Sequence, residues 1–141
     1  MRLEALVKRT PITVKSGASI KDAAKLFAKH EIGLLVVTSR EDPKRPEGVV
    51  SERDVVRAIA NGKSVNDSVD SIATRELVTV QRSDSLSKAL KKMLDHNIRH
   101  LVVENFDGTL YGVVSVRDFL RERKIFEELI KEEAKNSYAT D

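Results

Sequence analysis

The chain has 141 residues, of which 40% are hydrophobic and 33% charged, a composition typical of one globular domain or two very small ones rather than a disordered chain. It contains no cysteine, which excludes disulfide bonds, thiol catalysis and thiolate metal sites, and no apolar stretch approaches the roughly 18 residues of a membrane span. We therefore expect a soluble, cytoplasmic protein whose net charge of +3 suits a phosphate-bearing ligand but is too small to establish nucleic-acid binding.

The first predicted elements are a short helix, a short strand and a longer helix. Leu3, Leu6 and Val7 have helical spacing, and the strand follows at Ile12–Val14. Ser19 is placed to cap the longer helix. The apolar positions of that helix recur at i, i+3, i+4, i+7 and i+8, as on a helix with one buried face: Ile20, Ala23, Ala24, Phe27 and Ala28.

Two strands and a second helix complete the first half of the chain. Leu34–Thr38 is a continuous apolar run, typical of a strand that is buried on both faces. A proline-containing loop, residues 41–46, connects it to a further strand at Gly48–Val50. The second helix begins at Ser51.

The second half repeats the first. Pro11–Val14 aligns with Leu77–Val80 at an offset of 66 positions, and Gly48–Asp54 aligns with Gly112–Asp118 at an offset of 64. The loop 41–46 absorbs the two extra residues, as surface loops do. We infer a tandem duplication of a unit of roughly 60 residues.

The predicted fold class is α+β, a mixed α/β architecture, because each unit has the order strand, helix, strand, strand, helix. A unit this small buries little surface alone. We therefore expect two pseudo-symmetric β-α-β-β-α units packed sheet to sheet, with two clefts between them. The predicted domains are residues 1–63 and 64–123, followed by a C-terminal helical extension and tail, residues 124–141. In that extension an apolar stripe either packs on its own module or forms a partner or dimer contact: Ile125, Phe126, Leu129 and Ile130.

The tail of each unit reads Gly-Val-Val-Ser-x-Arg-Asp, and two interpretations of it stay open. In the first, Ser51 or Ser115 caps a helix, and Asp54 or Asp118 reaches back to complete a capping box. In the second, the same turn binds a ligand: the Ser, the Arg and the helix start hold phosphate, the Asp accepts from a ribose diol, and the Gly lets the ligand approach the strand. Phosphate, ribose and an apolar wall together describe an adenosine nucleotide.

On these motifs the chain resembles a tandem pair of CBS domains, the Bateman module. The segments "PITV", "LVTV" and "HNIRHLVV" match that family's pattern as well, and the resemblance runs from about residue 3 to residue 123. It implies a stand-alone regulatory module, not an enzyme and without a cofactor of its own. The module would bind AMP, ADP, ATP, S-adenosylmethionine or NAD, form homodimers and signal to an unidentified protein partner.

The resemblance also implies site residues. Asp54 and Asp118 would hold ribose, and phosphate would be held by Ser51, Ser115, Arg53 and Arg117. The base would be walled by residues at and before the strands: Thr13, Val14, Thr79, Val80, Ile32, Gly33, Ile98 and Arg99. The first copy has Gly33-Leu34 where the second has Arg99-His100, whose side chains donate to phosphate. We therefore expect unequal clefts, with the tighter AMP site at Asp118.

Other functions have weaker support in the residues. His96 and His100 are separated by a predicted turn, so they do not share a helical face as a zinc-binding HExxH motif requires, and no metal site is predicted. There is no glycine-rich phosphate loop or nucleophile elbow, so no catalytic residue is predicted. Nucleic-acid binding is the alternative from another class, because of the clusters Lys44-Arg45, Lys91-Lys92 and Arg121–Lys124, although acidic residues are interleaved with them. A purely structural or protein-interaction module is a further alternative.

Overall fold

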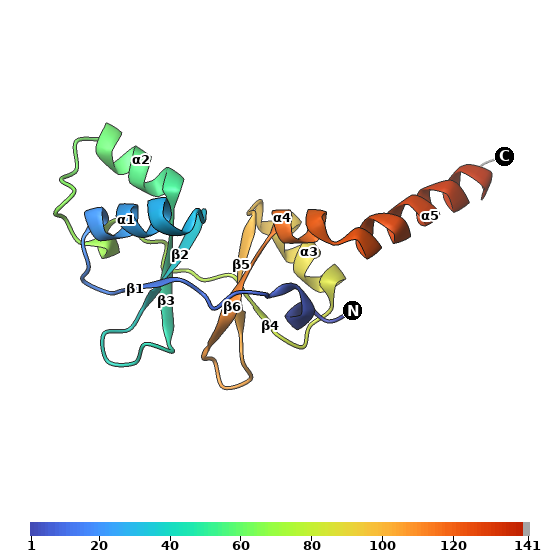
Figure 1. Cartoon of the computed structure of the whole chain (residues 1–141), viewed down its shortest axis with the longest axis horizontal. Helices are drawn as coiled ribbons and strands as arrows, with labels where there is room; N and C mark the ends of the chain where they lie inside the picture. The colour runs from blue at the N-terminus through green and yellow to red at the C-terminus, as the bar shows by residue number, and fades with distance from the viewer. Residues whose placement is uncertain (140–141) are drawn as a thin grey trace.

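The computed structural model describes residues 1–139, apart from the side chains of Ile125, Phe126 and Leu129 and of residues 136–139. The elements of the first half are the 3₁₀ helix η1 (Leu3–Leu6), β1 (Thr13–Lys15), α1 (Ile20–His30), β2 (Leu34–Thr38), β3 (Pro46–Ser51) and α2 (Glu52–Ala60). Those of the second half are η2 (Val69–Ser71), β4 (Thr79–Gln81), α3 (Leu86–His96), β5 (His100–Glu104), β6 (Leu110–Ser115), α4 (Val116–Arg121) and α5 (Arg123–Ala139). The predicted order of elements is confirmed in both halves (Figure 1).

Each half forms a three-stranded sheet of the same topology. The strand orders are β1-β2-β3 and β4-β5-β6, with the first pair of each sheet parallel and the second antiparallel. The register repeats as well, since Thr13 pairs with Val36 and Thr79 pairs with Val102. The duplication seen in the sequence is therefore a duplication of structure.

The central strands β2 and β5 are buried on both faces, as their apolar runs predict. Leu35 and Val37 belong to the core of the first half, where the amphipathic helices α1 and α2 cover the sheet. Val36 lies between them on the strand and therefore points to the opposite face, yet it is 0% exposed and belongs to neither core. Its repeat partner Val102 is 2% exposed and likewise outside both cores. The two sheets thus pack against each other through these faces, which confirms the predicted fold.

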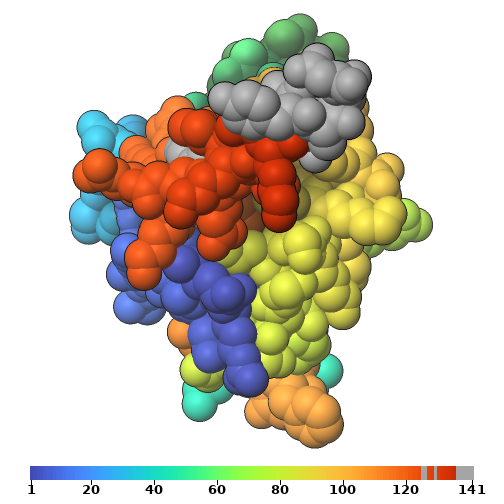
Figure 2. Space-filling view, turned by 90° about the vertical axis from the view of Figure 1, so that its right-hand side faces the viewer, coloured from blue at the N-terminus to red at the C-terminus, as the bar shows by residue number. Residues whose placement is uncertain are grey.

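The two halves exchange their leading segments, which the sequence did not predict. Leu3 and Leu6 of η1 are buried in the core of the second half, whereas Val69, just ahead of β4, is buried in the core of the first. Backbone hydrogen bonds follow the same exchange: Leu3 N donates to Asp84 O at 2.9 Å, and Val69 N donates to Ala18 O at 2.7 Å. Figure 2 shows the blue N-terminal segment lying against the yellow-green second half. The domain boundaries stay predictions, but the two packed cores do not coincide with the two sequence units.

The repeated glycine of the motif makes room for these crossing segments. A Cβ on Gly48 would lie 3.0 Å from the carbonyl oxygen of Thr74, and one on Gly112 would collide with the side chain of Val7. Thr74 and Val49 also exchange backbone hydrogen bonds, at 3.0 and 2.9 Å. The expectation that this glycine admits a ligand is therefore corrected: it admits the crossing chain.

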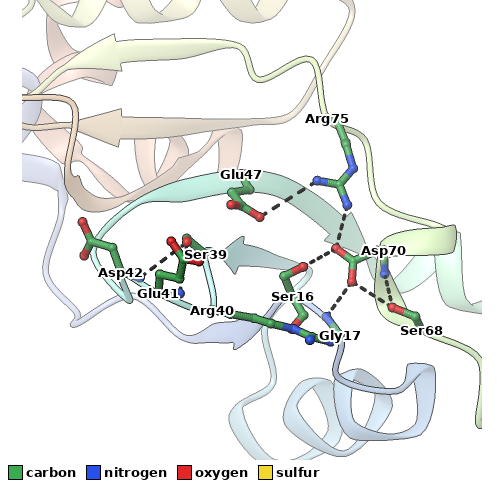
Figure 3. Close-up of polar contacts among 10 residues, drawn as sticks. All are labelled: Ser16, Gly17, Ser39, Arg40, Glu41, Asp42, Glu47, Ser68, Asp70 and Arg75. Carbon is green, nitrogen blue, oxygen red and sulfur yellow. Dashed lines mark hydrogen bonds and ion pairs between the residues drawn. The ribbon is translucent and has the colours of Figure 1, made fainter.

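The second crossing segment is held by a carboxylate with four donors (Figure 3). Asp70 accepts from Ser16 Oγ at 2.9 Å, Ser68 Oγ at 2.8 Å, the Gly17 N–H, and Arg75 Nη2 at 2.7 Å. Burial raises the pKa of Asp70, but the hydrogen bonds and the Arg75 charge outweigh it, so the pKa lies below its ordinary value. The anchor therefore works as an anion.

The first crossing segment has a more exposed anchor at the equivalent position. Glu4 accepts from Arg82 Nε at 2.9 Å, and the Arg82 guanidinium lies over the Tyr111 ring, 4.2 Å from its centroid. Both side chains of this pair keep a third or more of their area exposed.

The last helix, α5, extends away from the two sheets (Figure 1). Ile130 is 66% exposed, and the other three residues of the predicted apolar stripe, Ile125, Phe126 and Leu129, lie outside the described side chains. Within the described part of the chain, no helix combines the length and the apolar character that crossing a bilayer requires.

Candidate functional site

A cavity of about 930 Å³ opens between the two halves, at the upper end of the range for small-molecule sites. Three parts of the chain line it. The first half contributes the segments that lead into β1 and β2, the second half contributes the start of β5 and the turn into α4, and the crossing segment contributes Lys8, Arg9 and Thr10. The cavity is therefore an inter-unit cleft, as the duplication predicts.

Strand topology brings these segments to one edge. Parallel strands β1 and β2 begin at the same edge of their sheet, and the antiparallel β3 ends there, so Leu34 pairs with Ser51. In the second half His100 likewise pairs with Ser115. The turn into α4 is fixed to the preceding segment by a hydrogen bond from Val116 N to Arg99 O at 2.9 Å.

The Ser-x-x-Asp turns are capping boxes in both halves. Ser51 N donates to Asp54 Oδ2 at 2.8 Å, and Asp54 N donates back to Ser51 Oγ at 3.1 Å. The second turn has the same bonds, at 2.7 Å from Ser115 N to Asp118 Oδ2 and at 3.3 Å from Asp118 N to Ser115 Oγ. The capping interpretation is thus confirmed.

The capping box also orients the Asp118 carboxylate in the cleft. The carboxylate accepts from Ser115 N and from Ser115 Oγ through Oδ2, and within the described residues Oδ1 has no hydrogen-bond partner. Asp118 lines the cavity, and its Oδ1 keeps its capacity to accept a hydrogen bond. The Ser115 hydroxyl is engaged in the box, so a phosphate would have to share it.

Seven of the predicted site residues line this cavity: Ile32, Gly33, Arg99, His100, Ser115, Arg117 and Asp118. Ser51, Arg53 and Asp54 lie at the corresponding turn of the first half, and Thr79 and Ile98 belong to β4 and the β5 approach of the second. Thr13 is the first residue of β1 and directly follows Ile12, which lines the cavity. Val14 and Val80 are 6% and 2% exposed, because alternation along their strands turns them into the two cores and away from any ligand.

Sequence reasoning missed several lining residues. Lys8 and Arg9 reach the cleft only because their segment crosses to the other half, and helical periodicity carries no signal for that crossing. Glu31 lines the cleft from the end of α1 in the left-handed conformation, with φ of 52°. Its repeat partner Asn97 has the same left-handed conformation. Asparagine favours that conformation, so the alignment of Glu31 with Asn97 was the sequence signal that could have indicated it.

His100 lines the cleft, and its surroundings shift its pKa. Burial lowers its pKa below the ordinary value, the nearby Arg99 and Arg117 lower it further, and the Asp118 carboxylate opposes them. The imidazole is therefore neutral near pH 7. Gly33 of the first half lies beside this imidazole, since a Cβ added to Gly33 would be in ordinary van der Waals contact with the ring, at 3.6 Å.

Metal ligands are not gathered here. His30 and His100 line the cleft and His96 does not. Within residues 1–139, as far as their side chains are described, no group of three or more His, Cys, Asp or Glu is placed to hold a metal ion.

The sequence model of the CBS domain family matches this chain twice, at residues 3–61 and 69–125. The chain belongs to the CBS domain family. It is 43% identical to a CBS domain protein of Pyrobaculum aerophilum solved in complex with AMP, with a TM-score of 0.87 and coverage of 93% of this chain and 99% of that one.

Two further relatives are similar over most of this chain. The CBS domain pair of the protein MJ0100, solved with 5′-methylthioadenosine and S-adenosyl-L-methionine, is 26% identical with a TM-score of 0.78, covering 86% of this chain and 94% of that one. A 17.7 kDa protein of Acidianus ambivalens is 35% identical over 108 residues, which are 77% of this chain. This chain spans 64% of that relative's length.

Proposed function

We propose that this CBS pair is a regulatory module that binds an adenosine nucleotide, AMP or ADP first among them, in the cleft at Asp118. The observation that carries the proposal is the meeting of three kinds of surface in one cavity. The cleft combines the Asp118 carboxylate, the cations Arg99 and Arg117, and the apolar segments around Ile12 and Ile32.

Each surface suits one part of the ligand. Asp118 Oδ1 accepts from a ribose hydroxyl, since a ribose presents two neighbouring donors. Arg99 and Arg117 offer charge-assisted hydrogen bonds to phosphate oxygens. Pro11, Ile12 and Ile32 form an apolar wall for the flat base.

The relatives support the choice of an adenosine ligand. The Pyrobaculum aerophilum protein was solved with AMP, and the MJ0100 domain pair with two other adenosine derivatives. ATP, NAD and S-adenosylmethionine therefore stay in the set of candidate ligands for this chain. The proposal assigns no catalytic step to the cleft.

Signalling would follow from differential binding. The ligand contacts both halves and the crossing segment at once, so it favours the arrangement of the halves that closes on it. The exposed apolar residues of α2 and α4 support a homodimer: Val56 is 66% exposed, Ile59 54% and Leu120 57%. We expect sedimentation of a dimer at micromolar concentration, and Val56→Glu with Leu120→Glu shifts it to a monomer of 15.8 kDa. A wild-type monomer contradicts this part of the proposal.

A melting-temperature screen tests the ligand. AMP, ADP, ATP, NAD and S-adenosylmethionine are each added, with guanosine monophosphate as control. An adenosine nucleotide at about 100 times its dissociation constant adds roughly 2.7 kcal/mol to the free energy of unfolding by mass action. If none of these compounds raises the melting temperature at millimolar concentration, the proposed function is wrong.

A further inference from the structure

The junction between α4 and α5 differs from the same point in the first half. In the first half, α2 is one unbroken helix, Glu52–Ala60. In the second half, α4 ends at Arg121, Glu122 has an extended backbone, and a new helix begins at Arg123. At the repeat offset of 64 positions, Glu122 corresponds to Ala58, which lies inside α2. The first half therefore has one helix where the second half has two.

The position of Glu122, and not its local sequence, explains the break. The segment 121–124 consists of arginine, glutamate and lysine, which are good helix formers. Ala58, however, is 4% exposed and belongs to the core of the first half. A continuous helix would direct the Glu122 carboxylate into the second core, and burying an unpaired charge there is costly. The break instead brings Glu122 to the cleft, which it lines.

The break also places the base of α5 on the cleft. The last three residues before α5 all line the cavity: Leu120, Arg121 and Glu122. Beyond them α5 extends away from the two sheets (Figure 1), and every side chain of α5 that the structure describes is exposed. One extended residue thus joins α4 to a helix whose direction is fixed by little packing, as at the hinges of moving segments.

From these observations we infer that Glu122 is a hinge that couples the direction of α5 to the contents of the cleft. The carboxylate keeps α4 and α5 apart because it is placed in the cleft rather than in the core. An anionic ligand in the cavity repels this carboxylate, so binding disfavours the present arrangement of the hinge and turns α5. The hinge needs no ligand to exist, whereas its coupling to a nucleotide rests on the proposed function.

Spin labels on the full chain measure the direction of α5. The chain has no cysteine, so introduced cysteines are the only labelled positions. Lys135→Cys on α5 is combined with Lys91→Cys on α3, and both lysines are exposed. Lys135 is 13 positions beyond Glu122, or about 20 Å along a helix, so a turn of about 30° moves its label by about 10 Å. Pulsed electron paramagnetic resonance resolves such a shift.

Substitutions of Glu122 test the hinge without nucleotide. Glu122→Ala copies Ala58, Glu122→Gln removes the charge at nearly the same size, and Glu122→Asp keeps the charge. The control, Glu132→Ala, removes a carboxylate from an exposed position of α5 outside the cleft. We expect the label distance to shift by about 10 Å in the Ala and Gln variants and to change little in the Asp variant and the control. If both neutral variants keep the wild-type distance, Glu122 is not the hinge and the inference is overturned.

AMP at a concentration that saturates the protein in calorimetry tests the coupling. We expect AMP to shift the label distance in the wild type and to leave it unchanged in Glu122→Ala, although both proteins bind AMP. If bound AMP does not change the wild-type distance, the coupling is overturned and the proposed function stands. If no adenosine compound binds, the proposed function fails and the coupling fails with it, while the comparison without nucleotide still decides whether Glu122 is the hinge.

Discussion

The turns at Asp54 and Asp118 have the same internal geometry and different surroundings. In each, Ser donates from its backbone to Asp Oδ2, at 2.8 Å in the first and 2.7 Å in the second. The cavity that Asp118 lines is also lined by Lys8 and Arg9 of a crossing segment, and neither forms an ion pair with the described residues, whereas Arg75, the repeat partner of Arg9, is paired with Asp70. The shared turn is therefore a helix cap in both halves, and of the two aspartates only Asp118 lines the described cavity.

The crossing segments show the same division. Both place an apolar residue in the other half's core, but one is anchored by the many-donor Asp70 and the other by the exposed Glu4–Arg82 pair. The segment with the weaker polar anchor is the one that lines the cleft. Substitutions at corresponding positions of the two halves therefore distinguish residues that stabilise the fold from residues that bind the ligand.

The largest expected effect is on the crossing itself. Leu3→Ala should lower the free energy of unfolding by about 2–5 kcal/mol, because the side chain is fully buried in the second half's core. Urea denaturation measures it, with the 80% exposed Leu94→Ala as a control that should change little. A Leu3→Ala value as small as that control would show that the crossing contributes no packing energy.

The next prediction compares Asp118 and Asp54 as side chains that bind the nucleotide. Asp118→Ala should weaken AMP binding about ten- to hundredfold, and Asp54→Ala should weaken it less, because only Asp118 lines the described cavity. Both variants lose the bond from the Ser backbone N–H to the Asp carboxylate that completes the capping box, so each should lose about 1 kcal/mol of stability and serve as the other's folding control. Equal losses of affinity in calorimetry would remove the predicted asymmetry.

The crossing anchors should differ in pH dependence. The pKa of Asp70 is lowered in the folded state, so its stabilisation is present above the unfolded pKa near 3.8 and is lost as pH falls through the lower folded pKa. Asp70→Asn should cost about 1–2 kcal/mol at pH 7 and progressively less in acid. Glu4→Gln, at the equivalent exposed pair, should cost no more than about 1 kcal/mol. Identical urea profiles for the two variants would contradict the comparison.

The smallest effect concerns His100. Because burial lowers its pKa in the folded protein, the unfolded chain binds more protons just below the ordinary pKa, so stability falls as pH drops from 7 toward 5. His100→Leu, which copies the repeat partner Leu34, should remove that part of the dependence. Thermal melts of both proteins across this range measure it, and an unchanged slope in the variant would exclude His100 as its source.

Much of the fold could be read from local patterns. The offset of 66 predicted the duplication, and helical periodicity with Ser19 and Ser51 as caps predicted where helices begin, because caps depend on residues three positions apart. The crossing could not be predicted this way. Periodicity shows that Leu3 and Leu6 have a buried face, but it does not say which core receives them.

The site was predictable to the same extent. Ser115, Arg117 and Asp118 are visible as a motif, and the structure places all three on the cleft. Lys8 and Arg9 belong to no motif, because their place on the cleft depends on tertiary structure alone. For Gly112 the sequence indicated correctly that a small residue is needed, but the reason was wrong. The side chain of Val7, and not a ligand, occupies the space that a Cβ would take.

The exchange of leading segments sets the order in which the molecule can be completed during synthesis. The core that buries Leu3 of the N-terminal segment includes Phe119, which lies 116 positions later in the chain. The core around Leu3 therefore cannot be completed before residues more than a hundred positions later have been made, and contacts of such long sequence separation close slowly. The cleft is walled by the same segment, so it is among the last parts of the molecule to form. A fragment ending at residue 63 would contain Leu3 and Leu6 without the core that buries them, and the complementary fragment would contain that core without Leu3 and Leu6. Mixing the two fragments, rather than studying either alone, is the way to recover the protein from its halves.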